Sequence, residues 1–284
     1  MDKLNIITGI RSKNPSLVLI YATCQGDEIA QLLCTKEEFN EKYSIIGVIH
    51  NYQCIQNNKF CVNHRLIDSI DVFIYQPIDD SYGRHATDYI IQRLKPTCKL
   101  ISIPYINNIS LWPIIPSMSR DMVDPSDWNI GNENRIIINI GIIDKLIAEG
   151  ASKQDVLDLY DTDAIDFEYS KRYSTTMEML AKRESITDIK VCDYIDKNLK
   201  KERSFIYCNH PTPHVFVFMT NQILELLNLP IITENFPLSF QHYSRMFFGF
   251  PKTAVCHFGF EFVSEEEMIT ADKRYRDIIV KYLK

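Results

Sequence analysis

Residues 17–33 have the sequence LVLIYATCQGDEIAQLL, in which an apolar run is followed by a polar turn and then by a helical pattern. Leu17 to Tyr21 form an apolar, partly β-branched run, which is typical of a strand buried in a sheet. From Asp27 onward, apolar residues recur at helical spacing and acidic residues occupy the first turn. The stretch therefore predicts a strand that turns sharply into a helix.

The turn between this strand and this helix contains Thr23, Cys24 and Gln25. Backbone N–H groups and the helix dipole favour negative charge there, and open α/β sheets bind their ligands at that edge. Cys24 therefore stands where a nucleophile or an anion-binding group would stand. The alternative is a half-buried structural cysteine, because free cysteine is among the most buried residue types.

Composition limits the class of protein. The chain has 284 residues, 45% of them hydrophobic and 24% charged, as expected of a globular protein with ample core. No run of about 18 apolar residues and no signal-peptide pattern occurs, so we expect no membrane insertion. Eight cysteines without CxxC spacing predict reduced thiols and a cytoplasmic location. The net charge of −6 argues against a nucleic-acid partner.

The first 120 residues alternate strand-like and helix-like segments. Further strands are expected at 44–50, 71–75 and 98–103, and a helix at 82–94 that ends before Pro96. This order predicts an α/β subdomain over residues 1–120, with a small, mostly parallel sheet and helices packed on it.

Residues 121–284 are predicted to be mainly helical. Helices are expected at 136–148, 152–159, 166–182, 189–199, 215–227 and from 264 onward. Ser152 with Asp155, and Ser264 with Glu267, have capping-box spacing at two of the starts. Residues 204–207 are expected to return one strand to the parallel sheet.

Three polar clusters follow predicted strands, around Cys24, Gln76 and His210. If all three strands belong to one parallel sheet, these side chains converge at its carboxyl edge. His210 is placed like a general base, although a lone histidine is more often a structural hydrogen-bonding group, and His214 could take the role instead. Gln76 and Asp79 could equally satisfy the turn at Pro77.

The sequence lacks the motifs of several common enzyme classes and metal sites. GxGxxG and P-loop sequences are absent, so dinucleotide oxidoreductases and ATPases have no support. Neither HExxH nor paired Cys/His ligand spacing occurs, so no metal site is predicted.

The clusters taken together resemble the WcbI-like family of polysaccharide-biosynthesis acetyltransferases. The resemblance rests on five motifs in order, YATCQ (21–25), FIYQPIDDSY (73–82), IPYINNISLWPIIP (103–116), YSTTMEMLAKRESITDIKVCDYI (173–195) and YCNHPTPH (207–214). It covers about residues 17 to 229. Thr23 stands where the family usually has asparagine; it can still hydrogen-bond, with a shorter reach.

The resemblance implies a coenzyme A-binding, cradle-like fold in which much helix surrounds a small α/β subdomain. It also implies acetyl transfer from acetyl-CoA to a sugar or nucleotide-sugar in glycan synthesis, with O- and N-acetylation both open. The residues expected to hold the cofactor are Thr23, Gln76, Asp79, Tyr82, Arg84, Lys182 and Arg183, the last three as candidates for its phosphates.

Acyl transfer needs a base and donors for the developing oxyanion. We expect His210 to be the base, oriented by Asn209 or an acidic residue, and Gln25 or Gln76 with backbone N–H groups around Cys24 to be the donors. Direct transfer past Cys24 is favoured slightly over an acetyl-Cys24 intermediate, because Asp27 and Glu28 lie close to the thiol in sequence.

Two other functions are compatible with the same residues. One is an SGNH-like esterase or thioesterase that uses Cys24 and His210, although the usual serine at the turn is absent. The other is a non-catalytic module that binds coenzyme A.

Overall fold

The computed structural model describes residues 14–58, 62, 64–114, 141–241 and 249–283. Its N-terminal part contains a four-stranded parallel sheet. The strands are β1 (Ser16–Ala22), β2 (Tyr43–His50), β3 (Val72–Tyr75) and β4 (Lys99–Ser102), in the order β2-β1-β3-β4. These four strands confirm the predicted α/β fold. Because Ala22 pairs with His50 and Tyr75 with Ser102, the strands end at one edge and the residues after them meet there.

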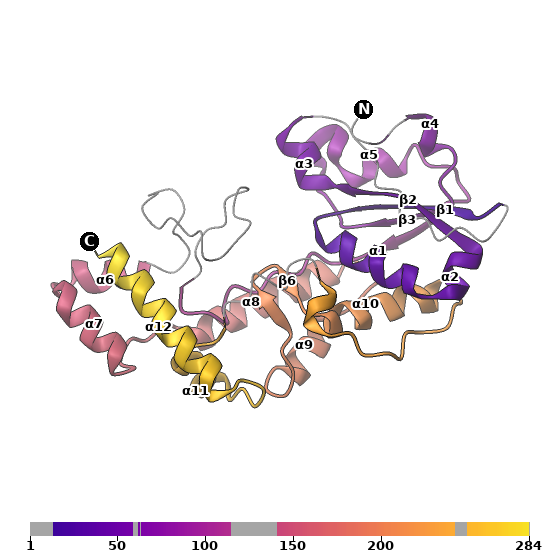
Figure 1. The fold of residues 1–284 in the computed structure, drawn as a ribbon. Helices are drawn as coiled ribbons and strands as arrows, with labels where there is room; N and C mark the ends of the chain where they lie inside the picture. The colour runs from indigo at the N-terminus through magenta and orange to yellow at the C-terminus, as the bar shows by residue number, and fades with distance from the viewer. Residues whose placement is uncertain (1–13, 59–61, 63, 115–140, 242–248, 284) are drawn as a thin grey trace. The chain divides into compact units, whose positions relative to one another are not determined.

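Helices cover both faces of this sheet (Figure 1). One face carries α1 (Gln25–Thr35), α2 (Glu37–Lys42) and α10 (Pro213–Leu226), and the other carries α3 (Asn51–Gln56), α4 (His64–Ile67) and α5 (Thr87–Ile91). The single helix predicted at 82–94 is wrong. The structure has a 3-10 helix, η1 (Asp80–His85), which is kinked at Gly83 with a φ of 55°, and then α5. The extended backbone of Ala86 separates the two helices.

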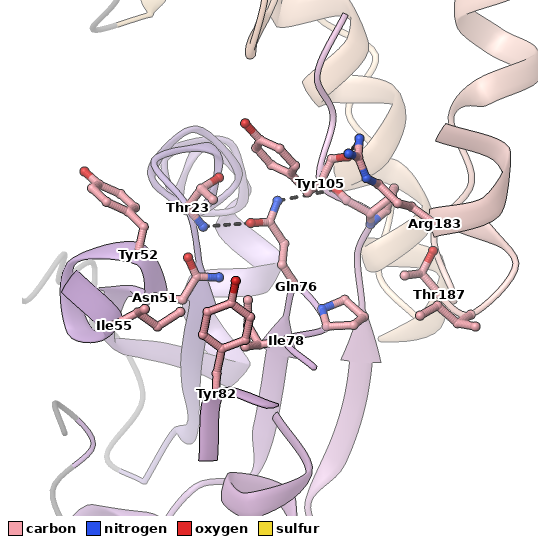
Figure 2. A pocket seen from close by; sticks show the side chains of 13 residues that line it. Thr23, Asn51, Tyr52, Ile55, Gln76, Ile78, Tyr82, Tyr105, Arg183 and Thr187 are labelled. Atoms are coloured by element: carbon pink, nitrogen blue, oxygen red, sulfur yellow. Dashed lines mark hydrogen bonds between the residues drawn. The ribbon is translucent and has the colours of Figure 1, made fainter. Parts of the chain in front are cut away.

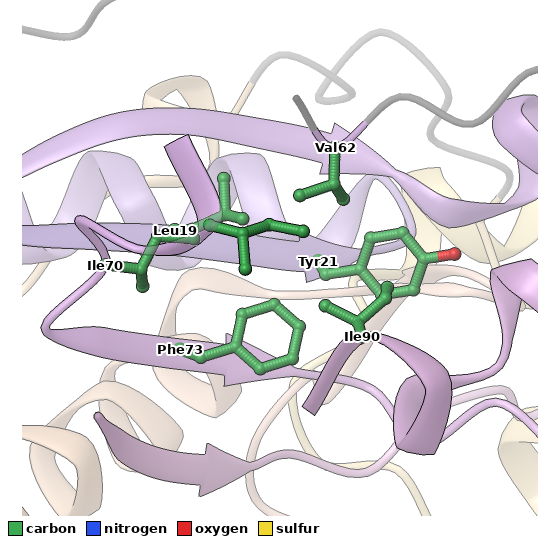
Figure 3. Packing of buried hydrophobic residues seen from close by; sticks show 7 residues of the cluster. Leu19, Tyr21, Val62, Ile70, Phe73 and Ile90 are labelled. Atoms are coloured by element: carbon green, nitrogen blue, oxygen red, sulfur yellow. The ribbon is translucent and has the colours of Figure 1, made fainter. Parts of the chain in front are cut away.

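Alternate residues of β1 face opposite layers, as strand geometry requires. Leu19 and Tyr21 pack with Phe73 in a buried cluster that also contains Val62, Ile67, Ile70 and Ile90 (Figure 3). On the other face, a Cβ added to Gly26 would lie 3.0 Å from Ile20 Cγ2 and 3.0 Å from Ala22 Cβ. The missing side chain of Gly26 therefore lets the first turn of α1 approach the sheet closely, which fixes the turn that carries Cys24.

The described chain forms two compact units built from interleaved segments. The sheet unit comprises Met1–Tyr105, Leu180–Tyr194 and Pro213–Pro237, and the helical unit comprises Ile106–Met179, Ile195–Thr212 and Leu238–Lys284. The boundary expected at residue 120 falls outside the described residues, and each unit takes segments from both sides of it. Two helices, α8 (Tyr169–Glu184) and α9 (Cys192–Asn198), contribute residues to both units.

The helical unit contains α6 (Gly141–Ala148), α7 (Lys153–Asp161), η3 (Leu238–Phe240), α11 (Lys252–Phe258) and α12 (Glu265–Tyr282). Trp112 is buried against Phe250, with ring centroids 5.2 Å apart, and its indole N–H donates to the carbonyl oxygen of Gly249. Burial of these large aromatic side chains supplies much of the unit's apolar core.

Both predicted helix caps are present in this unit. Ser152 and Asp155 form a complete capping box at α7. At α12, Ser264 accepts a hydrogen bond from the Glu267 N–H, while the Glu267 carboxylate forms an ion pair with Arg203 at 2.6 Å.

The strand predicted at 204–207 does not return to the parallel sheet. Instead β5 (Phe205–Tyr207) pairs antiparallel with β6 (His210–Pro211) in a separate two-stranded hairpin of the helical unit. Tyr207 pairs with His210, so Cys208 and Asn209 form the two-residue turn between them. The shared parallel sheet from which convergence of this segment at the carboxyl edge was predicted is therefore absent.

Candidate functional site

Gln76 joins three of the strand ends at the carboxyl edge. Its Oε1 accepts the Thr23 N–H at 2.7 Å, and its Nε2 donates to Gln25 Oε1 at 3.0 Å and to the Pro104 carbonyl oxygen at 3.4 Å. The Gln76 and Gln25 side chains are 2% and 1% exposed, so these bonds are shielded from water. Gln76 therefore holds the Cys24 turn in register with the segments after β3 and β4.

Backbone amides on both sides of Cys24 have hydrogen-bond partners. Thr23 donates its N–H to Gln76, and Gly26 donates its N–H to the Thr23 carbonyl oxygen at 3.0 Å. Cys24 is half-buried at the N-cap position of α1, with φ −54° and ψ −18°. These bonds fix the backbone of the turn, and its oxyanion role stays a prediction.

A cavity of about 410 Å³ opens at this edge of the sheet unit (Figure 2). Aromatic and aliphatic side chains make most of its wall, and Thr23, Gln76, Asn51 and Arg183 add polar groups. Tyr82 is 51% exposed beside it. The size and the mixed lining are those of a small-molecule site.

Two cavity residues present hydrogen-bond donors. Asn51 is 2% exposed, and its Nδ2 makes no hydrogen bond within the part of the chain that the structure describes. Figure 2 shows its side chain between Tyr52, Tyr82 and Gln76. Arg183 lies 5.3 Å from the Tyr105 ring and donates one N–H to the Tyr105 carbonyl oxygen at 3.3 Å. A buried amide donor and a guanidinium in one cavity favour a ligand with acceptor oxygens or an anionic group.

The cavity brings together four of the residues predicted to bind a cofactor, Thr23, Gln76, Tyr82 and Arg183. The other three are absent from its lining. Asp79 caps η1 and accepts the Ser81 N–H, which holds the pKa of its carboxyl below the usual range. Arg84 donates to Asn58, and Lys182 is an exposed residue in the last turn of α8.

His210 and Asn209 lie in the β5–β6 hairpin of the helical unit, whereas Cys24 and the cavity belong to the sheet unit. The His210 side chain is 7% exposed, and burial lowers its pKa to about 4. A histidine with so low a pKa is neutral at pH 7 and a weak proton acceptor. Its role as the base stays a prediction. His214, the alternative, is exposed in the first turn of α10.

Sequence reasoning missed the end of β2, which supplies His50, Asn51 and Tyr52. His50 Nε2 lies 2.7 Å from Asp27 Oδ2, and Asn51 and Tyr52 line the cavity. The signal was present, because His50 ends a predicted strand and Asn51 and Tyr52 directly follow it. Tyr105 was missed in the same way after β4.

Metal-binding clusters and membrane-spanning helices are both missing from the described residues. In that part of the chain, no group of three or more His, Cys, Asp or Glu side chains is arranged to hold a metal ion. None of the helices built from those residues combines the length and the apolar character that crossing a membrane requires. The fold and the cavity define an α/β protein with a cavity at the carboxyl edge of a parallel sheet.

The chain belongs to the family described as polysaccharide biosynthesis enzyme WcbI, whose model matches residues 17–231. It is also similar to a solved structure described as WcbI, a novel polysaccharide biosynthesis enzyme, in a native form without a disulfide bond between coenzyme A and one of its cysteines. That similarity has a TM-score of 0.64 at 15% identity, and it covers 95% of this chain and 94% of the other. No curated protein matches the chain.

Proposed function

We propose that this chain binds coenzyme A at the carboxyl edge of its parallel sheet and transfers an acetyl group from acetyl-CoA to a sugar or nucleotide-sugar. The observation that carries the proposal is the set of hydrogen bonds made by the Gln76 side chain, which fixes the Cys24 turn next to the cavity. Membership of a polysaccharide biosynthesis family supports a sugar-type acceptor. The coenzyme A named for the similar WcbI structure supports the cofactor.

The cavity residues fit one end of such a cofactor. Tyrosine rings can stack on a planar base or pack against a pantetheine chain, and Arg183 can pair with a phosphate. Asn51 supplies a buried amide donor that needs an acceptor oxygen. At about 410 Å³ the cavity holds a part of the cofactor, and the rest extends beyond it.

When bound, acetyl-CoA supplies a thioester whose acyl carbon is open to attack and whose thiolate can leave. The residues of this chain would position the thioester and transfer the proton of the acceptor. Gln76 and the turn residues fix the backbone beside the reacting group, and the apolar walls reduce the water around it.

Coenzyme A is expected to stabilise the folded protein. At about 100 times its dissociation constant, a ligand specific to the folded state adds about 2.7 kcal/mol to the free energy of unfolding. Thermal and chemical unfolding with increasing coenzyme A measure this. Arg183→Gln should weaken binding about tenfold because it removes the cationic partner, whereas Lys171→Gln, elsewhere on α8 and 77% exposed, should leave binding unchanged. No stabilisation of folded protein by millimolar coenzyme A would refute the cofactor.

Cys24→Ala is expected to keep acetyl transfer within about tenfold, which corresponds to about 1.4 kcal/mol of barrier. In direct transfer the thiol only lines the reacting position, so intact-mass measurement after acetyl-CoA treatment should show no acetyl group on Cys24. The exposed Cys256 provides a control through Cys256→Ala. An acetyl adduct on Cys24 that disappears when sugar is added would establish the covalent route instead.

The same assay separates the alternative functions. Release of free thiol only when a sugar is present indicates transfer, whereas release into water alone indicates an esterase or thioesterase. Binding of coenzyme A with no release under any condition indicates a binding module.

A further inference from the structure

A histidine–carboxylate pair lies at the carboxyl edge of the sheet beside the Cys24 turn. His50 is the last residue of β2 and pairs in register with Ala22, the last residue of β1. Its partner Asp27 lies in the first turn of α1, where its N–H donates to the Cys24 carbonyl oxygen at 3.1 Å. The pair thus joins α1, which begins at the turn, to β2, the strand that pairs with β1.

The contacts of His50 orient its ring. Nε2 lies 2.7 Å from Asp27 Oδ2, and the imidazole stacks on Tyr52 with centroids 5.7 Å apart and planes 15° from parallel. With the Nε2 proton donated to Asp27, neutral His50 carries its lone pair on Nδ1. A carboxylate that fixes one ring nitrogen so that the other can accept a proton is the arrangement that general bases use.

The surroundings of the pair connect it to the cavity. Asn51 and Tyr52, which follow His50, line the cavity, as does Thr23, which follows its register partner Ala22. The side chains of His50 and Asp27 are 22% and 32% exposed, so solvent and ligands can reach them. The imidazole forms a hydrogen bond with Asp27 from α1 and stacks on Tyr52 from α3.

We propose that His50, oriented by Asp27, is the general base of the acetyl transfer, the role that the sequence analysis predicts for His210. This inference rests on the proposed function and names the residue that moves the proton. His50 takes the proton of the acceptor hydroxyl or amine onto Nδ1 as the acceptor atom bonds to the acyl carbon. It then gives that proton to the departing sulfur as the carbon–sulfur bond breaks, so atoms and charge balance.

The competing structural explanation is that the pair only ties α1 to β2. Partly exposed ion pairs contribute about 0–1 kcal/mol to the free energy of unfolding. If the pair is purely structural, replacing His50 should therefore change stability slightly and leave turnover nearly unchanged. A base has a large effect on turnover and a small effect on binding. Variants of the pair therefore separate the two roles.

Labelling of histidines with diethyl pyrocarbonate tests whether His50 lies next to bound coenzyme A, and it needs no sugar acceptor. Peptide mass measurement should show His50 modified in the free protein and at least fivefold protected by saturating coenzyme A. His214, exposed on α10, should react equally with and without coenzyme A, and the buried His210 should react little in either case. Equal labelling of His50 in both samples, with coenzyme A shown to be bound, would overturn the proposal.

Turnover of variants tests the role. Thiol release from acetyl-CoA is measured with a panel of nucleotide-sugars and with water alone as acceptor. His50→Gln should lower release by ~10²–10⁴-fold with coenzyme A affinity unchanged within threefold. Asp27→Asn should lower it at least tenfold, because the ring loses the carboxylate that orients it. His257→Gln, at an exposed histidine of α11, should stay within threefold of the native protein.

The results distinguish refutation of His50 as the general base from refutation of the proposed acetyl transfer. Native-like turnover of His50→Gln, with loss in His210→Gln, would return the role to His210. Bound coenzyme A without thiol release by the native protein for any acceptor would refute both transfer and base. Failure of the native protein to bind coenzyme A would refute the proposed function itself.

Discussion

Gln76→Leu is expected to lower the free energy of unfolding by about 3 kcal/mol and to weaken coenzyme A binding at least tenfold. The substitution keeps most of the volume but removes both ends of the amide. The Thr23 N–H, Gln25 Oε1 and the Pro104 carbonyl oxygen then lose the partner that links them. Each buried polar group left without a partner costs about 1–3 kcal/mol. Urea unfolding and calorimetric titration with coenzyme A measure the two effects.

Gln154→Leu is the matched control for this experiment. Gln154 is exposed on α7 and makes one side-chain hydrogen bond, to Asp158 four residues later, so its loss should change stability by less than about 0.5 kcal/mol. If Gln76→Leu were as stable as this control and bound coenzyme A normally, Gln76 would not be the residue that holds the turn.

Glu267→Ala is expected to destabilise the protein by about 3–5 kcal/mol, because it leaves a buried guanidinium without its counter-charge. The Arg203 and Glu267 side chains are only 12% and 16% exposed. Burial lowers the pKa of Arg203, and the hydrogen bond and charge of Glu267 act against that shift. The guanidinium lies about 5 Å from the rings of Phe250 and Phe262, which cannot replace a carboxylate.

Chemical denaturation followed by fluorescence measures this loss, since Trp112 stacks on Phe250 in the same unit. Glu266→Ala is the control, because Glu266 occupies the same first turn of α12 and is exposed. Equal stability of the two variants would show that the ion pair contributes nothing, and that the aromatic cluster holds this region by itself.

The carboxyl-edge site could be predicted from the sequence because its signals are local. A buried run followed by polar residues marks a strand end, and parallel strands place such ends together; this reasoning located Cys24, Gln76 and the four-stranded sheet. The same rule applied to residues 44–50 would have found His50 and Asn51. Short-range capping patterns at Ser152 and Ser264 were predicted for the same reason.

The remaining features depend on contacts between residues distant in the sequence. The apolar run at 204–207 is equally suited to a parallel sheet or to a hairpin, and the pairing of Tyr207 with His210 decides between them. Asp27 looked like an ordinary first-turn acid, since its pairing with His50 involves a residue 23 positions away. Arg183 lies at a helix end, where cations are common, so only its position beside Tyr105 marks it as a cavity residue.

The interleaving of the two units has a consequence for how this protein can be inherited and dissected. The backbone passes from one unit to the other five times, after residues 105, 179, 194, 212 and 237. A single recombination crossover therefore cannot exchange one unit for a homologous copy, and no single truncation encodes either unit complete. The cavity of the sheet unit and the hairpin of the helical unit therefore cannot be separated by cutting the chain at one position.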